Sequence, residues 1–429
     1  MRWLPWLSCF VLSSFLFAQD LQDPDPKQRA RAARDLADRG VPALPQLQGL
    51  LSDPEVDVRL EAVKSIVAIG TQHSLDPLIQ ATRDNDPEIQ IRATDGLVNF
   101  YLPGYVKTGL TASLRRAGTA VKSRFTDTND QIIEAFIQPR AEIIEALGKL
   151  ARGASSMDAR ANAARAVGIL RGRAAVPDLV AALRSKDDRV IYESLIALQK
   201  IRDPEAAPQI TFLLKDFHEP VQLAAIETTG LLQNKAALGD LKEVLSRNRS
   251  KKVNRAALTA IAMLPDEGSR PLYLKYLNDK DDGMRAAAAE GLGRLKNPAD
   301  LPVIEKAFNE ERKNNARLSL AFAMVMLGKT ETTEFSPLQY LINTLNSTSY
   351  RGVARPFLVE LSRDTGIRQA LYPAARTGTK DEKMEIAQIL ARSGQKDSLP
   401  VLENLSRDSD PEVAQEGLRA LRSLKARLP

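Results

Sequence analysis

Apolar and polar residues recur along most of this chain in a unit of about 31 residues. Each clear copy holds an Ala-rich stretch, a short turn, and then an apolar residue and a proline that open a second apolar stretch. In the copy over 281–311, the apolar positions of the first stretch follow the spacing of one helix face: Met284, Ala287, Ala288, Gly291, Leu292 and Leu295. The pattern therefore predicts two helices per unit.

Proline anchors mark the second stretch of the unit at a nearly constant interval. They are Pro177, Pro208, Pro271, Pro302 and Pro400, with Gly239 in the slot after Pro208. Successive differences from 177 through 208, 239 and 271 to 302 are 31, 31, 32 and 31. Proline is tolerated there because the first helical turn has unpaired N–H groups. Such a period predicts an all-α, right-handed α-solenoid (superhelix) of about eleven helical hairpins over residues 19–429, each stacked on its neighbours.

The first helix of the clearest copy, MRAAAAEGLGRL over Met284–Leu295, resembles the HEAT repeat family. It is similar in particular to the short bacterial form that also occurs in phycobilisome lyases. The resemblance covers most of residues 23–425. It implies that the second helices line a concave face that binds other proteins, and it leaves a bilin-lyase-like enzyme subunit as an alternative.

The period fails in two places, and the chain closes on an unpaired segment. Residues 118–156 are predicted to be a degenerate repeat whose first helix is replaced by a loop, followed by a helix through Ala151 that begins at the capping-box pattern of Thr128 and Gln131. Residues 329–336 make a second unit longer than the regular period. Residues 411–428 hold one helix with an Arg- and Lys-rich outer face, which predicts a C-terminal capping helix.

The first residues have the pattern of a secretory signal peptide over 1–18. Arg2 precedes an apolar run from Trp3 to Phe17 that is short for a membrane span, and cleavage is expected after Ala18. An uncleaved anchor is the alternative. Removal would take the only cysteine, Cys9, and would change the net charge from +6 to +5. We expect an exported protein, periplasmic or extracellular, without disulfides or thiolate metal sites.

Residues with catalytic chemistry are scarce. The two histidines, His73 and His218, stand 145 residues apart, and each is better explained by a turn or a cap. The acidic run Asp127–Asp130 lacks the glycine and the distal glutamate of a calcium loop. No Gly-x-Ser-x-Gly or phosphate-loop motif is present. We therefore predict no catalytic residues, no cofactor and no metal.

Two basic segments and two tyrosines are the candidate partner-binding residues. Arg247, Arg249, Lys251, Lys252 and Arg255 lie where other units carry acidic residues, opposed to the helix dipole. A weaker cluster contains Arg115 and Arg116. In the second helices, Tyr273 and Phe308 fall on inward positions, whereas Tyr276 and Tyr340 fall off that stripe and are candidate anchors.

These features favour an exported, non-enzymatic scaffold that binds a protein partner through its second-helix face. Besides the lyase-like subunit, the alternative is a peripheral binder of an anionic membrane surface through residues 247–255. The export signal and the lack of tryptophan after residue 6 disfavour nucleic acid as a partner.

Overall fold

A computed structural model describes residues 21–105 and 131–428 of the chain. These residues form 23 α-helices linked by short 3-10 helices and turns, and they contain no β-strand. The predicted all-α solenoid is confirmed. The chain divides into two compact units, one of Met1–Ile133 with Pro139–Ala206 and the other of Glu134–Gln138 with Ala207–Pro429.

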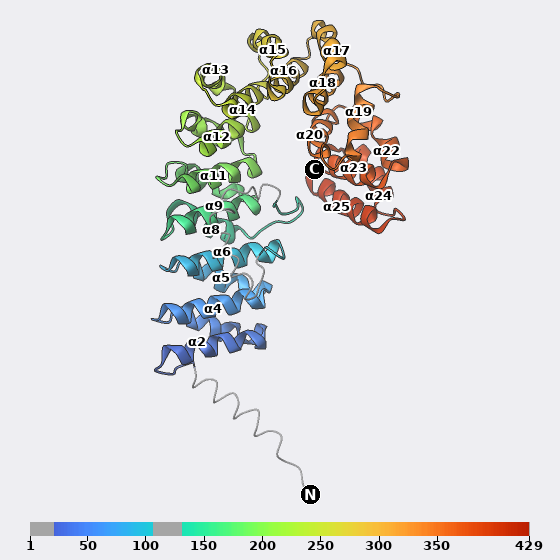
Figure 1. Cartoon of the computed structure of the whole chain (residues 1–429). Coiled ribbons are helices and arrows are strands. Elements are labelled where there is room, and N and C mark those ends of the chain that lie inside the picture. Colours follow the sequence, from blue (N-terminus) through green and yellow to red (C-terminus); the bar gives the residue numbers. More distant parts are fainter. Residues whose placement is uncertain (1–20, 106–130, 429) are drawn as a thin grey trace. The chain divides into compact units, whose positions relative to one another are not determined.

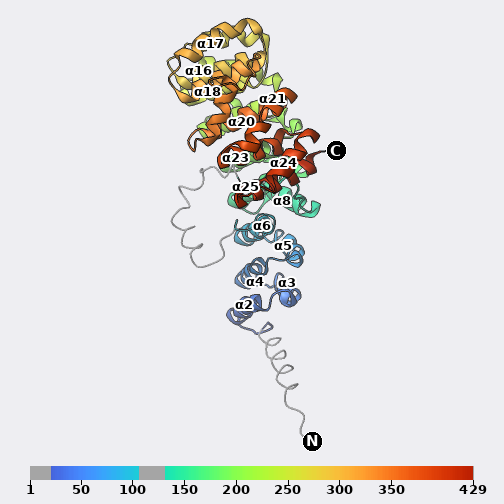
Figure 2. The same ribbon diagram turned by 90° about the vertical axis from the view of Figure 1, so that its right-hand side faces the viewer.

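In the first unit, the first helices of successive repeats pack on one another, and the second helices form a row beside them (Figures 1 and 2). The first helices are α2 (Pro26–Asp35), α4 (Val56–Ile69), α6 (Pro87–Tyr101), α9 (Met157–Ile169) and α11 (Asp188–Ile201). The second helices are α3 (Leu44–Leu50), α5 (Leu75–Ala81), α8 (Ala141–Gly153) and α10 (Val176–Ala182).

The second unit repeats this arrangement. Its first helices are α12 (Glu219–Leu231), α14 (Lys251–Ala262), α16 (Asp282–Leu295), α18 (Asn314–Met326), α20 (Arg351–Leu361), α23 (Lys380–Ser393) and α25 (Pro411–Arg427). The second helices are α13 (Leu238–Arg247), α15 (Arg270–Tyr276), α17 (Leu301–Glu310), α19 (Pro337–Asn343), the pair α21 (Thr365–Ala370) and α22 (Tyr372–Thr377), and α24 (Leu399–Leu405). Helix α25 packs on α23 and α24 where a helix was predicted, and its capping role stays a prediction.

Short 3-10 helices join many of these elements. They span Leu36–Arg39, Val41–Ala43, Gln72–Ser74, Arg173–Ala175, Pro204–Lys215, Lys235–Ala237, Glu267–Ser269, Pro298–Asp300, Thr344–Asn346 and Lys396–Ser398. The segment around Pro208 differs from the prediction, because a 3-10 helix over Pro204–Lys215 replaces the expected second α-helix. Pro208 lies inside this helix, where it has no N–H to donate to an α-helical hydrogen bond.

Helix starts follow the sequence signals. The Asp86 carboxylate accepts the backbone N–H groups of Glu88 and Ile89 at 2.9 and 3.0 Å, which caps α6 in front of Pro87. Pro177, Pro271, Pro302 and Pro400 each stand at the second position of a second helix, as the anchors predict.

The core depends on close approach between small and large residues. Tyr273 of α15 is fully buried, and its hydroxyl donates to the carbonyl oxygen of Ile261 at 3.0 Å. A Cβ atom at Gly291 would lie 2.5 Å from the Tyr273 ring, so the glycine makes room for it. Tyr273 and Phe308 are both buried, which confirms the inward positions predicted for them.

The interrupted repeat is organised differently from the prediction. Residues 106–130, which include Thr128, lie outside the described residues. Residues 131–140 are not helical, and α8 begins at Ala141, so the predicted helix start at the capping box of Thr128 and Gln131 is wrong. Pro139 accounts for the later start because it disfavours helical backbone at Gln138. Ile133 is instead buried, and its N–H donates to the carbonyl oxygen of Ile169 at 3.0 Å.

Helix α8 occupies the second-helix position of the repeat that α6 opens. It packs between the second helices α5 and α10, while α6 packs directly on the next first helix, α9. The segment between Tyr101 and Ala141 is therefore an insertion within one hairpin. The disturbance predicted at 329–336 is also present, as a turn between α18 and α19 in which Phe335 has a positive φ of 67°.

Candidate functional site

One side-chain position links the repeats along the edge where the first helices begin. It is the residue four places after the N-cap of a first helix, here called the bridging position. At Arg59 in α4, Nε and Nη2 donate to the carboxylate of Asp84 at 2.7 and 3.1 Å, and Nη1 donates to the carbonyl oxygen of Asp53 at 2.9 Å. Asp84 stands two places before the N-cap of α6, so one side chain joins the turns on both sides of its repeat.

The same geometry recurs in both units. Arg29 binds Asp53 at 2.8 and 2.9 Å, Arg285 binds Glu311 at 2.7 and 2.9 Å, and Lys383 binds Asp408 at 2.8 Å. The guanidinium of Arg285 holds the pKa of Glu311 below its ordinary value. These pairs fill the space between successive turns with charge-assisted hydrogen bonds.

Amides replace the cation at three bridging positions: Gln90, Gln222 and Asn254. Each donates to a carbonyl oxygen of the preceding turn, at 2.6, 2.8 and 3.2 Å respectively. An amide is shorter than a guanidinium and presents one carbonyl oxygen to the next turn in place of a fork of donors. Gln222 Oε1, for example, accepts from Asn248 Nδ2 of the next turn at 3.5 Å. Each of these residues lines a surface hollow, of about 460, 500 and 400 Å³.

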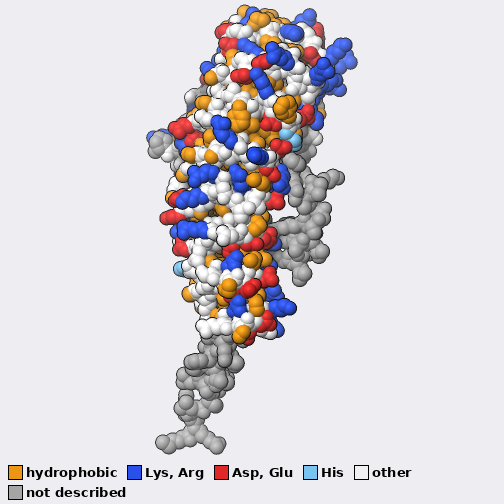
Figure 3. Space-filling model, turned by 90° about the vertical axis from the view of Figure 1, so that its left-hand side faces the viewer, with side chains coloured by type: hydrophobic (Ala, Val, Ile, Leu, Met, Phe, Trp, Pro, Cys, Tyr) orange, Lys and Arg blue, Asp and Glu red, His pale blue; other side chains and the backbone are white. Residues whose placement is uncertain are grey.

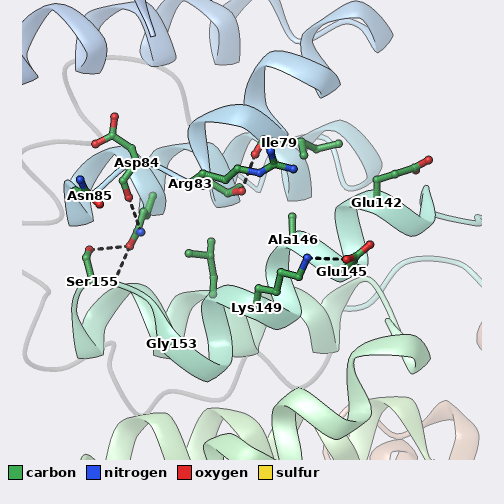
Figure 4. Close-up of a pocket in the computed structure, with 13 residues that line it drawn as sticks. Ile79, Arg83, Asp84, Asn85, Glu142, Glu145, Ala146, Lys149, Gly153 and Ser155 are labelled. Atoms are coloured by element: carbon green, nitrogen blue, oxygen red, sulfur yellow. Dashed lines mark hydrogen bonds and ion pairs between the residues drawn. The ribbon is translucent and has the colours of Figure 1, made fainter. Parts of the chain in front are cut away.

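The hollow at Gln90 lies between α5 and α8 in the first unit (Figure 4). The Gln90 carbonyl accepts hydrogen bonds from the N–H and hydroxyl of Ser155, at 3.1 and 2.8 Å. Lys149 and Glu145 form an ion pair along α8 at 2.6 Å. The polar groups of this hollow are thus largely engaged with one another.

The other two hollows flank the predicted basic segment in the second unit. The hollow at Gln222 is lined on one side by Asp216, Phe217 and Glu219 and on the other by Arg247, Asn248 and Ser250. The hollow at Asn254 is lined by Lys251, Tyr276, Asp279 and Met284, among others. The structure therefore brings Lys251 and Tyr276 to one hollow and Arg247 to its neighbour.

Three of the five cations of the basic segment have a carboxylate partner, one within its own helix and two in neighbouring repeats. Arg247 pairs with Glu243, Arg255 Nε donates to Asp281 at 2.6 Å, and Lys252 Nζ lies 4.0 Å from Glu219. Glu219 also accepts the Ser250 hydroxyl at 2.8 Å, so it places an acid beside a helix start that has none in its own first turn.

Arg249 and Lys251 are the cations of this segment that remain exposed with no ion pair in the described part of the chain. Figure 3 shows the wider context on one face, where Lys/Arg and Asp/Glu side chains are interleaved. The other predicted basic residues, Arg115 and Arg116, lie outside the described residues.

The two predicted tyrosine anchors are both half-buried. Tyr276 lines the hollow at Asn254, with Lys275 Nζ 5.0 Å from its ring centroid. Tyr340 packs edge-on against Phe308, with ring centroids 6.0 Å apart, and burial raises its pKa. The Arg317 guanidinium lies 4.7 Å from the Phe308 centroid and 5.7 Å from the Tyr340 centroid.

Sequence reasoning missed several residues of this edge. Phe217 is fully exposed at the mouth of the hollow at Gln222, and Phe335 is 87% exposed. The bridging positions, including Asn254 and Arg317, were also missed. Aligning the repeats on their helix N-caps would have revealed a column that is polar in most repeats, with Ile191, Ala354 and Ala414 as the exceptions.

The described residues hold no group of three or more His, Cys, Asp or Glu side chains placed to bind a metal ion. His73 lies in a 3-10 turn, and His218 is the N-cap residue of α12. Within the described ranges, no helix is both long and apolar enough to cross a membrane.

The repeats match a known family along much of the chain. Its description, HEAT repeats, matches residues 14–98, 144–230 and 238–324. The chain belongs to the HEAT-repeat family. No curated protein matches this HEAT-repeat chain.

Solved structures with helical repeats show similarity at low identity. The complex of CpcE and CpcF of phycocyanin lyase from Nostoc sp. PCC7120 is 19% identical, with 62% of this chain and 91% of that chain covered and a TM-score of 0.36. Importin beta is 13% identical, with 97% and 64% covered and a TM-score of 0.39. Kap121p bound to Pho4p is 12% identical, with 99% and 58% covered and a TM-score of 0.44.

Proposed function

We propose that this HEAT-repeat chain is an exported, non-enzymatic scaffold that binds a protein partner through the second helices and the adjoining turn edge of its second unit. The observation that carries the proposal is Phe217, whose side chain is fully exposed at the mouth of a hollow of about 500 Å³. Exposing a large aromatic side chain to water is unfavourable, and aromatic side chains are common anchors of interfaces.

The charged side chains near Phe217 indicate the chemistry of the partner. Arg249 lies in the turn that contributes Asn248 and Ser250 to this hollow, and Lys251, the first residue of α14, lines the neighbouring hollow at Asn254. Neither cation has an ion pair among the described residues. A partner segment with an apolar side chain for the hollow and acidic side chains for the two cations fits this edge. Two unpaired cations are few for attachment to a membrane surface, since each basic residue contributes only about 1 kcal/mol there.

The test is an affinity pull-down from the envelope or secreted fraction, followed by direct binding of the recombinant partner. Phe217→Ala should weaken binding about tenfold, a typical effect for a central anchor. Arg249→Glu with Lys251→Glu should weaken binding and reduce its dependence on salt. Matched control substitutions are Arg363→Glu and Arg422→Glu, which reverse exposed cations outside the second helices of the same unit.

Three results would count against the proposal. The first is that no partner binds the protein directly. The second is a partner whose affinity is unchanged by the Phe217 and Arg249/Lys251 variants. The third is binding of the protein to vesicles of anionic lipid that is lost in the Arg249/Lys251 charge-reversal variant. Export has a separate test. N-terminal sequencing of the protein from its own cells should begin at Gln19, and a chain that retains Arg2 would contradict cleavage.

A further inference from the structure

Arg317 stands at the bridging position of α18 without the partners that Arg29, Arg59 and Arg285 have at theirs. Arg160, at the bridging position of α9, also has no carboxylate partner, but its Nε donates to the carbonyl oxygen of Ala151 at 3.3 Å. Arg317 follows the N-cap of its helix by four residues, as Arg29, Arg59 and Arg285 do in theirs. Those three guanidinium groups each donate two hydrogen bonds to one carboxylate and a third to a carbonyl oxygen of the preceding turn. The position is therefore built for recognition of a carboxylate by a planar fork of donors.

The missing acid explains why Arg317 is left open. In the three closed pairs, the carboxylate comes from the residue two places before the next first-helix N-cap. Helix α20 has Tyr350 as its N-cap, which puts Thr348 at the equivalent place. Among the described residues, the Arg317 side chain makes no hydrogen bond or ion pair, and its Nε is buried without an acceptor. A buried donor without a partner is costly, so an acceptor supplied from outside would be favoured.

Aromatic rings hold the unpaired guanidinium in place. Its Cζ lies 4.7 Å from the Phe308 centroid and 5.7 Å from the Tyr340 centroid, within the range of cation–π attraction. The two rings meet edge to face, with an interplanar angle of 78°. Such a frame restrains the guanidinium before a ligand arrives, so less conformational freedom is lost on binding.

We propose that Arg317 is a binding site for the carboxylate of an aspartate or glutamate side chain of the protein partner, with Phe308 and Tyr340 as positioning residues. The assignment to a partner's side chain rests on the proposed scaffold function, whereas the affinity of this position for a carboxylate does not. The partner's acid would complete the inter-repeat pair that α18 lacks. An acidic partner residue at Arg317 also agrees with the acidic partner residues that we propose for Arg249 and Lys251.

Acetate is the probe for the carboxylate site in the full chain. In protein labelled with ¹⁵N-arginine, the Nε–Hε signal of Arg317, assigned by its loss in Arg317→Lys, should shift saturably with acetate. It should stay in place with acetamide, which matches acetate in shape without its charge. The Nε–Hε signals of Arg59 and Arg285 should not move, because their carboxylates are already bound.

An Arg317 signal that does not respond to acetate would overturn the proposal. So would one that shifts equally with acetamide, or in simple proportion to added salt as an exposed arginine such as Arg249 should. With a partner in hand, Arg317→Lys should weaken binding about tenfold because it keeps the charge and loses the fork. Arg312→Lys, at an exposed arginine on the turn before α18, is the control and should bind normally. Saturable acetate binding with no partner found would leave the carboxylate site standing and refute the scaffold.

Discussion

Restoring an arginine at one amide bridging position should close its hollow and stabilise the second unit. In Asn254→Arg, the new guanidinium would face Asp279, which stands two places before the N-cap of α16 as Asp84 does before that of α6. The Asp279 carboxylate accepts the N–H of Asp281 at 2.8 Å and has no ion pair in the described part of the chain. Asn254 itself has a buried Oδ1 without a hydrogen-bond partner. The substitution would thus pair one group and remove an unsatisfied one.

The closed pair Arg59–Asp84 sets the magnitude. Its side chains are 15% and 10% exposed, and its Nε–Oδ2 distance is 2.7 Å, so it lies between a surface pair and a buried one. Measured values for such pairs and for loss of an unsatisfied acceptor indicate a net gain of about 1 kcal/mol in the free energy of unfolding. For a unit of this size, that gain raises the unfolding temperature by roughly 2–4 °C.

A double-mutant cycle with Asp279→Asn isolates the new pair. Asparagine still accepts the Asp281 N–H, so the cycle changes the charge and keeps the local turn. Hydrogen exchange of α14 and α16 amides is the local readout, because repeats contact mainly their neighbours. Asn254→Met is the control for filling the hollow without charge.

A coupling energy of zero, or a destabilised Asn254→Arg, would refute the bridging geometry as the source of the hollow. The same variant tests function separately. Filling the hollow of about 400 Å³ beside Tyr276 should lower partner affinity, and unchanged affinity would show that the partner does not enter it.

Two further predictions concern stability. Glu311→Gln should lower the free energy of unfolding by about 1 kcal/mol near pH 7 and by little near pH 3. Arg285 lowers the pKa of the Glu311 carboxyl in the folded protein. The carboxylate therefore contributes its full stability above the unfolded-state pKa and loses it as the pH falls through the folded-state pKa. Denaturant unfolding at both pH values checks this, and an equal loss at the two would contradict it. Gly291→Ala should destabilise by roughly 1–3 kcal/mol because its Cβ meets the buried Tyr273 ring. The control is Gly239→Ala, which should be neutral or slightly stabilising because an added Cβ would have nothing within 4 Å. Thermal unfolding of both variants checks this, and similar stability changes in Gly291→Ala and Gly239→Ala would rule out the packing argument.

The environments of the predicted site residues depend partly on residues close in the sequence and partly on residues in neighbouring repeats. Tyr276 lines a hollow and Tyr340 is packed against Phe308 and Arg317, although both fall off the inward stripe of their helices. The basic segment looked like five free charges, yet Arg255 and Lys252 are paired with acids of neighbouring repeats. A run of like charges reveals its own sign, but its partners lie about one repeat away in the sequence and can be found only once the repeats are aligned in space.

The sequence by itself determined the helical-repeat architecture, the places where most of the helices begin, and the burial of Tyr273 and Phe308. These features follow from helical spacing, proline anchors and Asp-Pro caps, which act over a few residues. Only the tertiary structure decided that α8 completes the hairpin opened by α6, which hollows are open, and that Arg317 is left without an acid. Each of these depends on which turns lie side by side after the repeats stack, and stacking joins residues that local patterns cannot connect.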